Sequence, residues 1–215
     1  FLRPHGQVNG GTKQNTWCSA SDGSYYFVLT QPTGSDQDIT VFLDTGGGHK
    51  AALFTHNNDA ISDITGLTLY KDKVVIRSES SSSITNADIN TYDQTNDSDI
   101  PAASDGTDIT VDSDIELHIN SGEAFTPGGN VTAPKIHIKG TYTGASETLT
   151  LNGSGNSGSC DATVSTMAVF CLDSGTFTAS SNNVVLSGGD STTQALVGSA
   201  TFNNLSASTS GNGDH

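Results

Sequence analysis

Short apolar runs alternate with turn signals along the whole chain, and this pattern predicts strands. In the first part, up to about residue 80, the runs that fit buried strands are residues 25–30, 39–43, 51–54, 67–70 and 74–76. Clusters of Gly, Pro, Asn and Asp separate them, as expected for tight turns. Residues 67–77, with a short charged interruption, are typical of a hairpin. Little helix is expected.

Beyond about residue 84 the alternation becomes stricter and a motif repeats. Residues 115–119 alternate apolar and polar side chains, which predicts a strand with one buried face. The repeated element is a small residue followed by an aromatic and then Thr or Asn, and its aromatic residues are Phe125, Tyr142, Phe177 and Phe202. Residues 140–153 match residues 175–188, 35 positions further on. The polar run 80–83 divides a β-rich N-terminal region, residues 1–80, from a repeat region, residues 84–215.

The repetition predicts stacked units. Each unit is too short to bury its own apolar face, so it must pack on a neighbour of the same kind. If the 35-residue offset spans two coils, each coil has about 17 residues, which suits a β-solenoid with the repeated aromatic residues stacked inside. The predicted fold is therefore all-β: an N-terminal β-rich region leading into a parallel β-solenoid-like repeat region. An antiparallel β-sandwich with Gly-rich turns is the alternative.

Several segments of the repeat region have a distinctive sequence, among them ITNADI at residues 84–89, SGEAFTPGGNVT at 121–132 and the stretch 175–205. These segments resemble recurrent segments of secreted, repeat-rich β-helical surface proteins of uncultivated, candidate-phylum bacteria. The resemblance covers about residues 75–208 and carries no catalytic signature. It implies a β-helical architecture and a location outside the cell or on its surface, and it implies no particular activity.

The charge balance argues against two classes of binding partner, nucleic acids and membranes. Lys and Arg total 8 against 23 Asp and Glu, a formal net charge of −15. Phosphate recognition needs a basic stripe, so nucleic acid is not an expected partner. An anionic membrane surface would repel the chain, and no run approaches the ~20 apolar residues of a membrane span, so membrane insertion is not expected either. The sequence begins at Phe1 rather than Met, and we expect a secreted protein, extracellular or at the cell surface, that is processed or an excerpt.

The cysteines and sequons are consistent with secretion. Cys160 and Cys171 are close in sequence and predict an intramolecular disulfide, which forms in an oxidising compartment. Cys18 is then left over. Candidate glycosylation sites of the form Asn-x-Ser/Thr are Asn96, Asn130, Asn152 and Asn204.

Two groups of side chains have the chemistry of a metal site. The first is a turn-rich span of carboxylates that predicts a calcium site, although it lacks EF-hand spacing, and its members are Asp97, Asp99, Asp105 and Asp108. The second is His118 and His137, which point outward on neighbouring coils of the predicted solenoid. The alternative interpretation is that both histidines are simply polar side chains on the outer face of their strands. No cofactor is expected, and calcium at the first group is the one candidate.

The pattern favours a structural role over catalysis. No Gly-x-Ser-x-Gly elbow lies between a strand and a helix, and no catalytic residues are assigned, so an enzyme is not expected. The predicted function is that of a structural subunit of an extracellular filament or cell-surface array. Its partner is a further copy of itself, a homopolymer joined through strand edges and termini, including the polar tail 206–215. The alternatives are a monomeric adhesin or carbohydrate-binding surface module and, less favoured, a polysaccharide-active β-helix enzyme.

Overall fold

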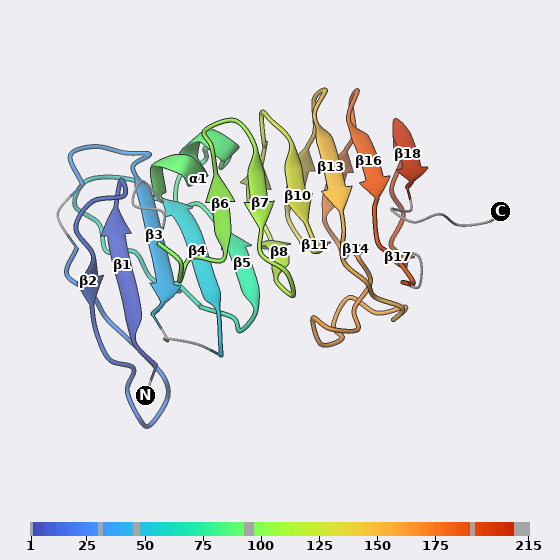
Figure 1. Ribbon diagram of the computed structural model, residues 1–215. Helices are drawn as coiled ribbons and strands as arrows, with labels where there is room; N and C mark the ends of the chain where they lie inside the picture. The colour runs from blue at the N-terminus through green and yellow to red at the C-terminus, as the bar shows by residue number, and fades with distance from the viewer. Residues whose placement is uncertain (1, 30–31, 45–47, 93–96, 190–191, 209–215) are drawn as a thin grey trace.

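The chain is nearly all β, and its strands lie side by side along one long axis (Figure 1). The computed structural model describes residues 2–29, 32–44, 48–92, 97–189 and 192–208. In these ranges the strands form three sheets of nine, six and three strands, and the one α-helix is α1, Asn86–Tyr92. Phe1 and residues 209–215 of the polar tail lie outside the described residues.

The nine-stranded sheet, here called the long sheet, runs from one end of the fold to the other. Its order is β17-β14-β11-β8-β5-β4-β3-β1-β2. Its strands are β1 Pro4–Val8, β2 Gln14–Asn15, β3 Asp38–Leu43, β4 Ala51–His56, β5 Lys73–Ile76, β8 Glu116–Ile119, β11 Lys135–Ile138, β14 Phe170–Leu172 and β17 Leu196–Val197. Every pair from β4 to β17 is parallel, whereas β1, β2 and β3 pair antiparallel. The sheet is therefore mixed.

Along the chain, the strands of the two smaller sheets alternate with those of the long sheet. The six-stranded sheet contains β6 Ala102–Ser104, β7 Ile109–Val111, β10 Val131–Ala133, β13 Thr148–Leu151, β16 Asn183–Leu186 and β18 Asn204–Ala207. The three-stranded sheet contains β9 Ala124–Phe125, β12 Thr141–Thr143 and β15 Thr176–Thr178. The chain visits all three sheets in the circuits β8-β9-β10, β11-β12-β13 and β14-β15-β16, so each circuit adds one parallel strand to each sheet.

One apolar core runs along the inside of these sheets. Alternate residues of a strand point to opposite faces, so Leu117 and Ile119 of β8 face the core and are fully buried. The same core cluster includes Phe54 of β4 and Val184 of β16. β5 precedes residues 80–83 and pairs both with β4 and with β8, which follows them. The long sheet therefore contains strands from both the N-terminal region and the repeat region.

The repeated aromatic side chains form a continuous row inside the fold. Ring centroids are 5.9 Å apart for Phe125 and Tyr142, 5.3 Å for Tyr142 and Phe177, and 5.5 Å for Phe177 and Phe202. Tyr142 pairs directly with Phe177 across β12 and β15. The 35-residue offset therefore covers one circuit, and the expectation that it spans two coils is wrong, although the circuit from Phe125 to its register partner Tyr142 does have 17 residues. The extra length is an excursion between β13 and β14, residues 152–169.

Two of the expected strands are not strands. Residues 25–29 and 67–70 have no regular secondary structure, and the predicted hairpin is wrong because β5 pairs in parallel with β4 and β8. Residues 25–29 instead lie over β1, where a Cβ placed on Gly6 would be 3.0 Å from Leu29. The hydroxyl of Tyr25 donates to the carbonyl of Leu67. These apolar runs pack on the sheet from outside instead of joining it.

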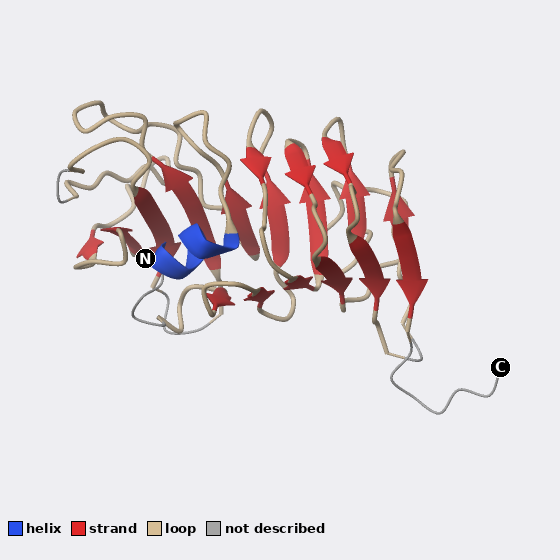
Figure 2. Ribbon diagram, turned by 90° about the horizontal axis from the view of Figure 1, so that it is seen from above, coloured by secondary structure: helices blue, strands red, loops and turns tan. Residues whose placement is uncertain are grey.

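Helix α1 was not expected from the apolar pattern, yet its start has a sequence signal. The Thr85 N–H donates to Asp88 Oδ2 at 2.7 Å, and the Asp88 N–H donates to Thr85 Oγ1 at 3.2 Å. This reciprocal cap satisfies backbone donors at the helix start. The helix buries Ile89 and packs against β3 and β6, beside the N-terminal half of the strand array (Figure 2).

Candidate assembly surface and buried polar cluster

The C-terminal end of the fold presents an open edge. β17 pairs with β14, β18 pairs with β16, and each is the last strand of its sheet among the described residues. Leu196 continues the inward row of Phe170, and Leu205 continues that of Val184. The preceding residues are 1% exposed, but Leu196 is 39% and Leu205 is 47% exposed. Side chains that belong to the core rows thus face solvent at this end.

We call β17, β18 and the intervening Phe202 the end rung. Phe202 is partly buried and its ring contacts that of Phe170 at 5.2 Å. Residues 191–213 contain no Asp, Glu, Lys or Arg, although the chain carries a net charge of −15. Natural sheet edges are commonly protected by charged side chains, and the end rung has none.

The free side of β18 has backbone groups available for pairing. The Ser208 N–H donates to the carbonyl of Leu186 in β16. Successive residues of a strand direct their N–H groups to opposite sides, so those of Leu205 and Ala207 point to the open side. The opposite end of the long sheet differs, because it finishes in antiparallel strands and the two-residue β2.

A polar cluster is buried on the outward face of the long sheet. His118 and His137 are register partners on β8 and β11, with ring centroids 4.9 Å apart. Glu116 Oε1 is 2.8 Å from His118 Nδ1 and 3.3 Å from His137 Nδ1. Lys73 Nζ is 2.8 Å from Glu116 Oε2. The histidines point away from the core, as the alternation predicts, but the side chains of Glu116 and His137 are only 1% and 2% exposed, so they are not solvated face residues.

Burial and neighbouring charges shift the pKa values of this cluster in opposite directions. Burial by itself raises the pKa of the Glu116 carboxyl, but the hydrogen bond from His118, the His137 ring at 3.3 Å and the charge of Lys73 outweigh it and lower the pKa far below the ordinary 4.5. Burial lowers the pKa of His118, although Glu116 pulls it upward. Glu116 is therefore an ionised carboxylate held by neighbouring donors.

The excursion between β13 and β14 is attached to this face by a disulfide and a lysine. Cys160 and Cys171 are joined, with Cα atoms 5.5 Å apart, so the predicted disulfide is confirmed. Lys135 Nζ, next to Glu116 in the register, donates to the carbonyl of Met167 at 3.2 Å. Cys18 is a half-buried free thiol.

Replacing Cys160 with Ser should release the excursion. The bridge closes a loop with a sequence separation of 11 residues, and its loss is expected to lower the free energy of unfolding by about 2–3 kcal/mol through greater freedom of the unfolded chain. Equilibrium urea unfolding of the oxidised protein and of Cys160→Ser measures the difference. Equal midpoints, or free thiols at both positions in a non-reduced digest, would contradict this expectation.

The acids of the predicted calcium site are bound locally and do not converge. Asp97 pairs with Lys13 and accepts the N–H of Asp99. Asp105 accepts N–H groups from its own turn, and Asp108 accepts both the N–H and the side-chain amide of Asn130. In the described part of the chain, none of these acids belongs to a cluster of three or more His, Cys, Asp or Glu side chains spaced to hold a metal ion.

The other sequence-predicted positions lie at the surface. Asn130, Asn152 and Asn204 are exposed, whereas Asn96 lies outside the described residues. Asn204 belongs to β18, and its side-chain amide donates to Asn183 Oδ1 at 2.8 Å.

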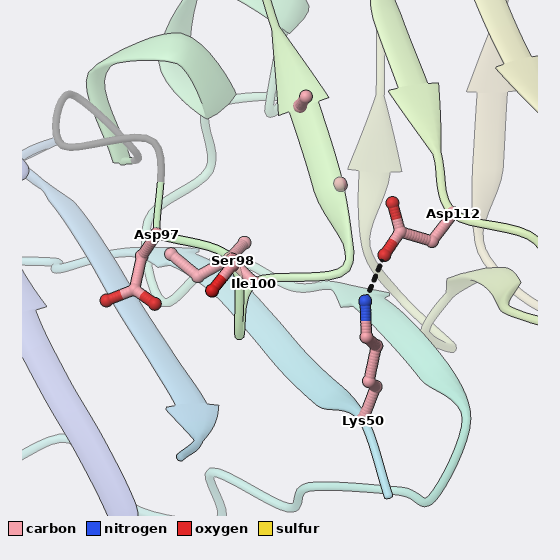
Figure 3. Close-up of a pocket in the computed structure, with 7 residues that line it drawn as sticks. Lys50, Asp97, Ser98, Ile100 and Asp112 are labelled. Carbon is pink, nitrogen blue, oxygen red and sulfur yellow. Dashed lines mark hydrogen bonds and ion pairs between the residues drawn. The ribbon is translucent and has the colours of Figure 1, made fainter. Parts of the chain in front are cut away.

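The described residues also form a surface pocket and a second buried group of ionisable side chains. A pocket of about 310 Å³ lies beside β6, lined by the ion pair of Lys50 and Asp112, by the Asp97 carboxylate and by small or apolar side chains (Figure 3). A second buried group contains His56, whose Nε2 is 3.0 Å from Asp38 Oδ1 and 3.8 Å from Asp88 Oδ2. Burial lowers the pKa of His56, but the two carboxylates outweigh it and raise that pKa overall.

Comparison with known proteins finds no match for this chain among family models, curated proteins or solved structures. Among the described residues, no helix has the length and apolar character needed to cross a membrane. The function must therefore be argued from the geometry above.

Proposed function

We propose that this chain is a structural subunit of an extracellular or cell-surface assembly, and that the end rung is the surface through which it self-associates. We also propose that the region from β5 to β18 is a parallel β-solenoid, apart from β6, which pairs antiparallel with β7. Its support is the repeated circuit through three sheets, with parallel pairing at each step and the aromatic row inside. The disulfide fits an oxidising extracellular environment.

The observation that carries the functional proposal is the uncharged, partly apolar end rung. An open strand edge with core-type side chains exposed is a template for pairing with another chain. Leu196 and Leu205 would lose their exposed surface in such a contact. Burial of their apolar surface would then stabilise the contact.

The occupant we propose is a second copy of this chain. Two copies each carry a charge of −15 and repel one another, except where neutral surfaces meet, and the end rung is such a surface. A two-fold axis would pair β18 with β18 of the second copy in antiparallel fashion, using the outward backbone groups of Leu205 and Ala207. Growth beyond a dimer needs a second contact, for which the edge of β2 is the candidate.

Leu205→Glu tests this proposal, because it places a charge in the middle of the contact. The substitution is expected to weaken self-association at least about tenfold, since an unpaired carboxylate would be buried there. Sedimentation velocity over a range of concentrations measures association. Thr110→Glu is the matched control: it adds the same charge at an exposed position of β7, which β16, β13 and β10 separate from β18.

Three outcomes are informative. Association of the unaltered chain that Leu205→Glu weakens and Thr110→Glu leaves intact supports the end rung. Equal weakening by both variants would assign the effect to charge alone and reject this surface. An unaltered chain that remains monomeric at high concentration overturns self-assembly.

One observation favours the alternative of an adhesin or carbohydrate-binding module. Trp17, Tyr26 and Tyr70 are 60%, 74% and 47% exposed, although the sequence suggested largely internal aromatic residues. Exposed aromatic faces are the usual stacking surface for sugar rings. A glycan-binding screen of the monomer, repeated with Trp17→Ala, is the measurement that would select this function.

A further inference from the structure

Three nitrogen donors converge on a single carboxylate oxygen in the buried polar cluster. Glu116 Oε1 is 2.8 Å from His118 Nδ1, 3.3 Å from His137 Nδ1 and 2.9 Å from Lys73 Nζ. Ligands of a tetrahedral metal ion, each about 2.0–2.1 Å from it, lie about 3.3 Å from one another. One ligand atom from Glu116, His118 and His137 lies within 4.8 Å of each of the others. The two histidines and the glutamate thus have nearly the spacing of a metal-ligand set before any ion binds.

His137 supplies an independent observation. Its side chain is 2% exposed, and neither ring nitrogen has a hydrogen-bond partner of acceptable geometry. Buried polar groups are normally satisfied, because a polar group that loses water without gaining a hydrogen bond destabilises the fold. Nδ1 lies 3.3 Å from Glu116 Oε1 without the geometry of a hydrogen bond to it. A bound ion at this position would satisfy it.

The surrounding charges have the arrangement that supports a metal-binding histidine. Asp173 Oδ2 is 3.5 Å from His137 Nε2, the nitrogen on the far side of the ring, and 3.2 Å from Lys139 Nζ. A carboxylate behind a ligating histidine orients the ring and makes it a better ligand. Lys73 Nζ lies 2.9 Å from Oε1 and 2.8 Å from Oε2 of Glu116, so it can move its hydrogen bond to Oε2 when an ion binds Oε1.

We propose that Glu116 Oε1, His118 Nδ1 and His137 Nδ1 form a binding site for one divalent transition-metal ion, with zinc the best match. Two imidazoles and one carboxylate suit zinc and its neighbours, whereas calcium prefers sites made only of oxygen. Three protein ligands leave one position for water. The ion takes the place of protons shared within the cluster, so binding releases protons. Lys73 and Lys135 repel the ion and limit its affinity.

The experiment is calorimetric titration of the EDTA-treated full chain with Zn²⁺, together with absorption spectroscopy of Co²⁺ as a probe of tetrahedral nitrogen and oxygen ligands. The unaltered protein and the control His49→Asn, which changes an exposed histidine, are expected to bind one equivalent. His137→Asn is expected to lose this binding. Asp173→Asn, at a position 36% exposed, is expected to weaken it about 10–100-fold, as for other carboxylates behind a ligating histidine.

Circular dichroism in EDTA shows which variants fold, and Asp173→Asn keeps the test decisive if His137→Asn does not. Each of three results would overturn the site: no saturable binding by the unaltered chain, equal affinity in Asp173→Asn, or full competition by Ca²⁺. The proposal is independent of self-assembly, because His118 and His137 lie on β8 and β11, away from the end rung.

Discussion

Phe177→Ala is expected to lower the free energy of unfolding by about 3–5 kcal/mol, because it leaves a cavity in the aromatic row. The Phe177 ring lies 5.3 Å from that of Tyr142, 5.3 Å from that of Phe170 and 5.5 Å from that of Phe202. It therefore connects its own circuit, which includes Phe170, with the circuit before it and with Phe202 of the end rung. Chemical unfolding followed by far-ultraviolet circular dichroism measures the loss.

The matched control is Tyr26→Ala, which removes an aromatic ring that is 74% exposed. Its effect is expected to stay within about 0.5 kcal/mol, as for other surface substitutions. An unchanged midpoint for Phe177→Ala would mean that the ring is solvated, and that the row of stacked aromatic side chains does not exist in solution.

The aromatic row was predictable from the sequence because it depends on a local motif that recurs. A small residue, an aromatic and a Thr mark the same place in each circuit, and equivalent places stack. The length of the circuit was not predictable in this way. The excursion at residues 152–169 falls between two copies of the motif, and an inserted loop cannot be distinguished by spacing from a second coil.

The runs at residues 25–29 and 67–70 show why apolar character alone overestimates strands. These segments have the composition of buried strands, and they are used to cover the sheet from outside. Whether an apolar run joins a sheet or lies on it depends on which edges are already taken, and this is decided by long-range pairing. In contrast, the capping pair of Thr85 and Asp88 is local and was available as a helix signal.

The buried polar cluster was only half predictable. Alternation along 115–119 and 136–138 places both histidines outward, and a stacked fold places them on neighbouring strands. Their partner Lys73 comes from a strand 43 residues before Glu116, so only the register of β5 against β8 brings the charges together. Their burial also depends on the covering segments, for which the sequence has no periodic signal.

Glu116→Gln, studied in EDTA so that no metal contributes, is expected to destabilise the fold by about 3 kcal/mol. Removing one member of a buried ion pair typically costs about 3–5 kcal/mol, because the remaining charge stays buried without compensation. The lower end applies because the Lys73 side chain is 23% exposed and retains some contact with water. Urea unfolding at neutral pH, where the Glu116 carboxylate is ionised, measures the change.

Two comparisons make that expectation specific. Asp112→Asn makes the same carboxylate-to-amide change in the ion pair with Lys50, whose side chains are 41% and 43% exposed, and it should cost no more than about 1 kcal/mol. The double variant Lys73→Met/Glu116→Gln removes both charges and should recover part of the stability lost in Glu116→Gln, because no unpaired lysine remains. A loss in Glu116→Gln as small as that in Asp112→Asn would show that water reaches the cluster. The ion pair of Lys73 and Glu116 would then behave like a surface pair, and the pKa of Glu116 would lie near its ordinary value.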